Sequence, residues 1–148
     1  MLNIRKLTTA DENEFITMCC DFYDTGATLY SLSRDKVKRT FDKILEEGPF
    51  ITAYMLIYNN LIAGYVNLSF TYSNEADGIV VFIEELYVKP EYQGKSIGTQ
   101  TLQFIFDHYN DKVKRYRLEV CKSNTDAIRL YEKIGFKNLD YKQMIFDL

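Results

Sequence analysis

Hydrophobic positions recur with a helical period along the first third of the chain. After a short strand predicted over residues 3–7, Thr9 and Glu12 have the Thr-x-x-Glu spacing of a capping box, which predicts a helix that ends near Gly26. Ser33 is the expected N-cap of a second helix, which a Gly-Pro pair ends. The apolar positions that carry the period are Phe15, Met18, Cys19 and Phe22 in the first helix and Val37, Phe41, Ile44 and Leu45 in the second.

The next part of the chain is rich in β-branched and aromatic residues. Residues 50–58 and 61–72 predict two strands, and the Asn-Asn pair between them tolerates the positive φ of a tight hairpin turn. Residues 79–88 begin as a run that is apolar at successive positions, which is typical of a central strand buried on both faces. These three segments predict the antiparallel part of a sheet.

The second half of the chain returns to alternating helices and strands. The expected order is helix, strand, helix and strand, over residues 96–109, 117–120, 124–134 and 142–148. Because this β-α-β unit follows a hairpin, the fold class is α/β (α+β), with a mixed, mostly antiparallel, twisted sheet flanked by about four helices. A chain of 148 residues fits one domain, with boundaries 1–148.

Composition and charge limit the kinds of partner and site that the chain can have. A net charge of −3 argues against a basic surface that follows a nucleic-acid backbone, so no nucleic-acid partner is expected. The single histidine, His108, excludes a two-histidine metal site, and the three cysteines lack metal-ligand spacing, so no metal is expected. The chain has 12 tyrosines and 21 acidic residues, so catalysis or binding is expected to depend on carboxylates, tyrosines and backbone groups.

The sequence also bears on location. The N-terminal residues have neither the apolar core of a signal peptide nor an Arg-rich amphipathic pattern. The apolar run Ile79–Ile83 is far too short to span a bilayer. We therefore expect a cytoplasmic protein with no membrane partner.

One loop stands out between the strand over residues 79–88 and the helix that follows it. Residues 92–98 read Tyr-Gln-Gly-Lys-Ser-Ile-Gly, and in this position backbone N–H groups and the helix N-terminus can bind a phosphate. An ordinary strand-to-helix loop is the simpler interpretation. The Gly-Lys-Ser triplet also matches the end of a Walker A motif, but the glycine that this motif needs five residues earlier is Lys89, followed by a proline.

Two further signals flank this loop. Glu84 and Glu85 interrupt the apolar strand, and because adjacent strand residues point to opposite faces, each face is expected to receive one carboxylate. Their ordinary interpretation is one solvated acid and one acid in an ion pair. In the helix over residues 124–134, Asn124 and Tyr131 share a face, so Tyr131 is either a core residue or a proton donor.

Together, the segment Phe82–Gly98 and the segment Leu130–Phe136, which reads Leu-Tyr-Glu-Lys-Ile-Gly-Phe, resemble the GNAT superfamily of N-acetyltransferases in order and spacing. The resemblance extends to the two helices and the hairpin that precede them. The family's pyrophosphate loop reads Gln/Arg-x-x-Gly-x-Gly/Ala, and here Ser96 replaces its first glycine.

The resemblance implies direct transfer of an acetyl group from acetyl-CoA to a primary amine, a small amine above all. Either Glu84 or Glu85 would be the catalytic base, directly or through water, and Tyr131 would protonate the leaving thiolate. The acidic pair is similar to that of the polyamine acetyltransferase branch, which favours Glu84 as base and Glu85 as the ammonium-binding group. Tyr30, in the connection between the first two helices, is expected at the acceptor site, and a homodimer through the final strand is a further expectation. The cofactor-binding residues that the resemblance implies are Leu86, Val88, Gln93, Gly94, Lys95, Ser96, Ile97, Gly98, Thr99 and Asn124.

Two other functions stay open at this point. A non-catalytic acyl-CoA-binding or sensor module would keep the phosphate-binding loop but transfer no acetyl group. A P-loop nucleotide-binding protein would bind ATP with magnesium in place of acetyl-CoA. The acceptor is equally open, from a small-molecule amine to an amine of a protein or peptide.

Overall fold

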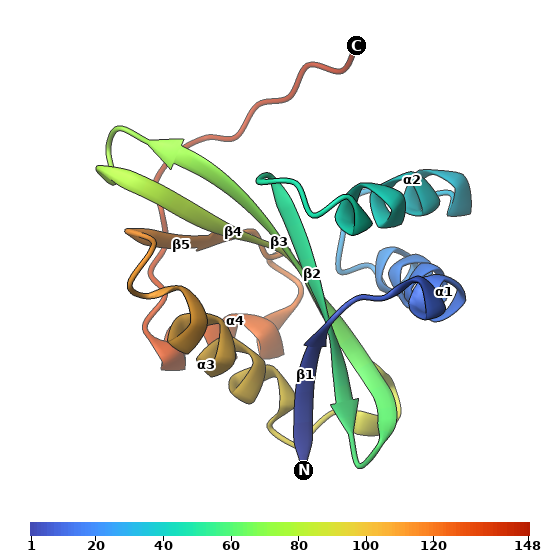
Figure 1. Cartoon of the computed structure of the whole chain (residues 1–148). Helices are drawn as coiled ribbons and strands as arrows, with labels where there is room; N and C mark the ends of the chain where they lie inside the picture. Colours follow the sequence, from blue (N-terminus) through green and yellow to red (C-terminus); the bar gives the residue numbers. More distant parts are fainter.

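The computed structural model describes residues 1–148 as one five-stranded sheet between two pairs of helices (Figure 1). The strands follow the chain in the order β1 (Leu2–Lys6), β2 (Ile51–Tyr58), β3 (Leu61–Ser73), β4 (Gly78–Val88) and β5 (Arg115–Leu118). The first four are antiparallel and β5 is parallel to β4, which confirms the mixed sheet. The helices are α1 (Glu12–Asp24), α2 (Arg34–Leu45), α3 (Ile97–Tyr109) and α4 (Thr125–Ile134).

The two faces of the sheet bury separate cores. Helices α1 and α2 cover one face, where Phe15, Met18 and Phe41 pack against Tyr65 and Tyr87. Helices α3 and α4 lie on the other face, and the core there is built around Leu68, Val81, Ile83, Leu102 and Ile105. The sheet is therefore a central layer, as the apolar start of β4 predicts.

Several local signals in the sequence are confirmed. The turn between β2 and β3 holds Asn59 at a φ of 50° and Asn60 at a φ of 65°. The Ser33 hydroxyl accepts a hydrogen bond from the Lys36 N–H at the start of α2. Gly135 ends α4 in the left-handed conformation, with a φ of 113°.

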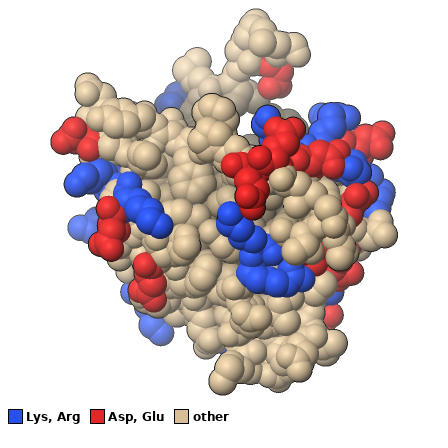
Figure 2. All heavy atoms as spheres, in the orientation of Figure 1, with Lys and Arg blue, Asp and Glu red and all other residues tan.

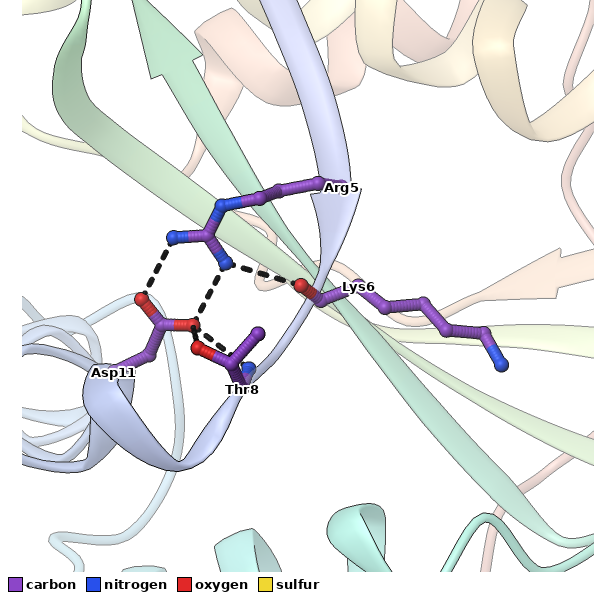
Figure 3. Close-up of polar contacts among 4 residues, drawn as sticks. All are labelled: Arg5, Lys6, Thr8 and Asp11. Atoms are coloured by element: carbon purple, nitrogen blue, oxygen red, sulfur yellow. Dashed lines mark hydrogen bonds and ion pairs between the residues drawn. The ribbon is translucent and has the colours of Figure 1, made fainter.

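The predicted capping box is wrong by one residue. The Thr8 N–H and hydroxyl donate to the Asp11 carboxylate over 2.8 and 2.9 Å, while Arg5 donates to both of its oxygens over 2.7 and 2.8 Å (Figure 3). Asp11 is only 4% exposed, and these donors, chiefly Arg5, hold the pKa of its carboxyl below the usual range. The cluster joins the end of β1 to the start of α1, so a buried acid, not Glu12, fixes this corner.

The expectation that Glu84 and Glu85 point to opposite faces is also wrong, because β4 contains a β-bulge. Asn67 of β3 pairs with Glu85 and the next β3 residue pairs with Ile83, which leaves Glu84 as the extra residue. Before the bulge, Ile83 faces α3; after it, Tyr87 faces α1, although both positions are odd-numbered. The extra residue thus turns Glu85 toward α1.

The two strands β4 and β5 separate where the bulge begins. Their pairing extends from Val80 and Arg115 to Ile83 and Leu118 and then stops. The remainder of β4, up to Val88, has a strand partner only on the β3 side. A gap between the strands therefore begins at the two glutamates.

The final strand predicted over residues 142–148 does not form. The chain beyond Ile134 runs past β5 without regular structure, and Phe146 is 89% exposed (Figure 1). Its β-rich composition favours an extended backbone, but a strand also needs a neighbour to pair with, and this segment has none here.

The outer surface carries charges of both signs. Figure 2 shows basic and acidic side chains intermixed over α1 and α2, with no continuous basic stripe on that face. No helix has the length and apolar character that crossing a membrane requires.

Candidate active site

A small cavity of about 60 Å³ lies where β4 leaves β5. It brings the adjacent Glu84 and Glu85 of β4 together with Tyr131 of α4, which lies far from them in the sequence. The other residues that line it are Phe22, Ala27, Ile83, Leu86, Glu119, Val120, Asn124 and Ala127. A larger cavity of about 290 Å³, between the end of α2 and the last turn of α3, contains none of the predicted site residues.

Glu85 is a buried carboxylate without a basic partner. It is 9% exposed, and its oxygens accept hydrogen bonds from the Tyr23 hydroxyl at 2.7 Å and the Tyr65 hydroxyl at 2.8 Å. The Cys19 thiol lies 3.8 Å from the second oxygen. Burial raises the pKa of Glu85, and the two tyrosine hydroxyls oppose this shift by stabilising the ionised form.

Glu84 occupies a different environment, although it is the neighbouring residue. Its side chain is exposed, and the Ser69 hydroxyl donates to it over 2.5 Å. Ser69 lies two residues along β3 from Asn67, which pairs with Glu85. Both carboxylates therefore reach the same face of the sheet, one solvated and one buried.

Tyr131 faces the cavity from α4. Its ring packs against Phe136, with ring centroids 5.8 Å apart, and burial raises the pKa of its hydroxyl. The phenol is consequently neutral at physiological pH and able to donate a proton. Asn124, the N-cap of α4, lines the same cavity, and its side-chain oxygen accepts a hydrogen bond from the Ala127 N–H.

The loop before α3 presents a row of unused hydrogen-bond donors. The backbone N–H groups from Gly94 to Thr99 have no acceptor within the chain. Ser96 has a φ of 59°, a left-handed conformation that favours glycine, the residue that the family pattern has at this position. The helix α3 adds its positive N-terminal end to these donors.

One side chain ties this loop to the end of β4 and another bonds within the loop. The Gln93 side-chain amide donates to the Val88 carbonyl at 3.1 Å, and the Lys95 ammonium donates to the Glu91 carbonyl at 2.5 Å. The loop itself stays exposed. This arrangement places the row of N–H groups directly after the open stretch of β4.

The open stretch of β4 points its main chain into the gap beside β5. The Lys89 N–H donates to Ala63 of β3 over 2.9 Å, and in an antiparallel ladder this orientation repeats at every second residue. Leu86 and Val88, the alternate positions, therefore direct their N–H and carbonyl groups away from β3. An extended chain in the gap could pair with them.

The structure also shows residues that the sequence analysis missed. Tyr23, Tyr65 and Glu119 were not singled out, yet the first two bind Glu85 and the third adds a carboxylate to the cavity. Tyr30, by contrast, is 67% exposed and does not line the cavity, whereas Ala27 from the same connection does. The cavity has three glutamates and no lysine, arginine or histidine in its lining.

A comparison of the sequence with models of protein families identifies the family of this chain. The model described as "Acetyltransferase (GNAT) family" matches residues 16–136, which include the whole cavity lining and the loop before α3. The chain belongs to the GNAT acetyltransferase family. This confirms the resemblance carried by the strand, loop and helix motifs.

Individual GNAT relatives match in part. A thialysine N-epsilon-acetyltransferase of Sus scrofa is 34% identical over 79 residues, 53% of this chain and 46% of the relative. A spermine/spermidine N(1)-acetyltransferase of Bacillus subtilis (strain 168) is 34% identical over 59 residues, 38% of this chain and 39% of the relative. The chain thus spans about half the length, or less, of the curated relatives it matches.

The fold of this GNAT protein also occurs among solved structures. A "predicted acetyltransferase with acetyl-CoA" from Clostridium acetobutylicum superposes with a TM-score of 0.78 at 19% sequence identity, covering 99% of this chain and 96% of the other. At this identity the match concerns the fold alone.

Proposed function

We propose that this protein is an acetyl-CoA-dependent N-acetyltransferase whose acceptor is a small cationic amine. The observation that carries the proposal is the composition of the cavity: three glutamates and a neutral tyrosine, without a basic side chain, next to a row of free backbone N–H groups. A negative cavity favours a positively charged acceptor, while the N–H groups favour an anionic donor molecule. The named acetyltransferase relatives support the same reaction class.

The residues present fit acetyl-CoA. The N–H groups from Gly94 to Thr99 and the positive end of α3 would hold its pyrophosphate, as Gln93 and Lys95 shape the loop. The N–H and carbonyl of Leu86 and the N–H of Val88, which point away from β3, would pair with its pantetheine arm, while the Val88 carbonyl already accepts from Gln93. Asn124, at the start of α4, would border the same arm. When bound, acetyl-CoA supplies the thioester carbon that the amine nitrogen attacks, and the thiolate of coenzyme A leaves.

The two glutamates have different roles toward the acceptor, one in removing a proton and one in binding. An alkyl ammonium group has a pKa of about 10, so a primary amine is almost fully protonated at neutral pH and must lose a proton before it can attack. Glu84, which is exposed and borders the cavity, takes this proton directly or through water. Glu85, which is buried and lacks a basic partner, binds an ammonium group.

Two negative charges that develop during the reaction, on the leaving thiolate and on the attacked carbonyl oxygen, are stabilised by Tyr131 and the main chain. Tyr131 protonates the thiolate, because its phenol stays neutral at the working pH. A β4 backbone N–H that points into the gap stabilises the oxyanion of the attacked carbonyl. No acyl-enzyme is needed, so Cys121 has no role in transfer.

Three finer features belong to the same proposal. The connection between α1 and α2, with Tyr30, borders the acceptor site, and Ala27 from this connection lines the cavity. The C-terminal segment, with Met144 and Phe146 exposed, forms a homodimer contact. Cys19, Cys20 and Cys121 are free thiols, which agrees with a reducing compartment such as the cytoplasm.

The experiment that tests the function is acetyl-CoA-dependent thiol release with a panel of primary amines. Diamines and polyamines are expected to be acetylated faster than aminoglycosides, amino acids or a lysine peptide. A parallel thermal-shift comparison distinguishes the alternatives: acetyl-CoA should raise the melting temperature, whereas ATP with magnesium should not. Binding of acetyl-CoA without thiol release for any amine would indicate the non-catalytic module.

A further inference from the structure

The hydrogen bonds to Glu85 use both of its oxygens and come only from neutral groups. The Tyr23 hydroxyl binds one oxygen at 2.7 Å and the Tyr65 hydroxyl binds the other at 2.8 Å. A carboxylate buried to this extent normally pairs with Arg or Lys, because an unpaired buried charge costs several kcal/mol. The titratable groups that act on the pKa of Glu85 are Tyr23, Tyr65, Glu84 and Cys19, none of which is a cation.

The two tyrosines are held by different parts of the fold. Tyr65 is fully buried in β3, where its ring packs on Phe15 with a centroid separation of 5.1 Å. Tyr23 is half-buried in the last turn of α1, and its carbonyl accepts a hydrogen bond from Thr28 of the following connection at 3.4 Å. The orientation of Glu85 is thus fixed from the sheet on one side and from the end of α1 on the other.

One further polar atom beside Glu85 lacks a partner. Asn67 lies opposite Glu85 in the β3–β4 ladder, and its side-chain oxygen is buried without any hydrogen bond. This atom is an acceptor, like the carboxylate next to it. The surroundings of Glu85 therefore hold an excess of acceptors, which an ammonium group of a ligand would satisfy.

We propose that Tyr23 and Tyr65 are positioning residues whose hydroxyls orient the Glu85 carboxylate and leave its negative charge free for the non-reacting ammonium group of a dicationic acceptor. The proposal rests on the proposed function and adds the residues that set its selectivity. A basic residue in place of either tyrosine would orient Glu85 equally well but would neutralise it. Neutral donors hold the carboxylate and keep its charge unpaired.

The test compares two acceptors in four proteins: wild type, Tyr23→Phe, Tyr65→Phe and the control Tyr87→Phe. Tyr87 packs on Tyr65, with ring centroids 6.0 Å apart, but its hydroxyl makes no bond to Glu85. The acceptors are 1,5-diaminopentane and pentylamine, which differ by one ammonium group. The measured quantity is the ratio of kcat/KM for the diamine to kcat/KM for the monoamine.

This ratio is expected to fall about tenfold in Tyr23→Phe and Tyr65→Phe, mainly through a higher KM for the diamine, because one charge-assisted hydrogen bond to Glu85 is lost. It is expected to be unchanged in Tyr87→Phe. A merely structural defect would lower both kcat/KM values equally and leave the ratio intact. If Tyr65→Phe does not fold, the ratio measured in Tyr23→Phe alone tests the proposal.

A second readout does not depend on activity. The titration of the Glu85 carboxyl, followed by carbon-13 NMR in protein labelled at glutamate, should move to higher pH in Tyr23→Phe and stay in place in Tyr87→Phe. If the wild type acetylated no amine, the proposed function would fail, while this titration would still judge the positioning role. An unchanged titration together with an unchanged acceptor ratio would overturn the proposal.

Discussion

Replacing Glu85 with glutamine removes a buried charge at nearly constant volume, and the structure predicts a more stable protein that binds a dicationic acceptor less tightly. Two tyrosine hydroxyls stabilise the carboxylate by about 1.5–3 kcal/mol each. Desolvation costs several kcal/mol and the charge of Glu84 adds to it. Because the pKa of Glu85 is raised overall, the unfavourable contributions exceed the hydrogen bonds.

The net gain for Glu85→Gln is on the order of 1 kcal/mol at neutral pH, which for a chain of this size is a rise in Tm of about 3 °C. A carboxyl whose pKa is higher in the fold than in the unfolded chain loses stability as pH rises through the folded pKa. Glutamine does not titrate. The Tm difference should therefore vanish below about pH 4, near the pKa of an unfolded glutamate, and reach its full size at neutral pH.

The assay is thermal unfolding between pH 4 and pH 8 for the wild type, Glu85→Gln and the control Glu132→Gln. Glu132 is exposed on α4 and has no ion-pair partner, so its substitution should leave Tm almost unchanged at every pH. A lower Tm for Glu85→Gln at pH 7.5, or a difference that does not vary with pH, would show that the buried charge of Glu85 does not destabilise the fold.

Three other substitutions test the fold and the loop. Asp11→Asn should cost about 3 kcal/mol in urea unfolding at pH 7, because Arg5 loses the charged partner Asp11, which is 4% exposed, and the cost should shrink as the pH falls from about 4 through the lowered pKa of Asp11. Gly64→Ala should cost about 3 kcal/mol or prevent folding, because its Cβ would lie 2.0 Å from the Tyr87 carbonyl oxygen, whereas the matched Gly48→Ala, with nothing within 4 Å, should be neutral. Ser96→Gly should raise stability by about 1 kcal/mol, since glycine adopts the left-handed φ of 59° at no cost, and a loss of stability would show that the Ser96 side chain has a contact of its own.

The order of elements could be read from the sequence because it depends on local signals. The Asn-Asn turn, the Ser33 cap and the glycine after α4 are each set by the conformations that a few neighbouring residues can adopt. The final strand could not be predicted in the same way. Residues 142–148 have strand-like composition, but pairing depends on an edge elsewhere in the fold, which no local signal reports.

The sequence predicted only part of the candidate site. Glu84, Glu85 and Tyr131 were predicted and lie at one cavity. The bulge that sets both carboxylates on one face was not, because it depends on the pairing of β4 with β3. Tyr23 carried one usable signal: it follows Cys19 by four residues and so shares the buried side of α1.

The proposed proton donor is tested by thiol release from Tyr131→Phe with a saturating diamine at pH 8. The Tyr131 phenol lies at the cavity, burial keeps it neutral, and its proposed role is to protonate the leaving thiolate. For this role, kcat should fall about 10²-fold in the variant, with the Kd for acetyl-CoA unchanged in a binding titration. A kcat equal to that of the wild type would contradict it, because the proton would then come from elsewhere.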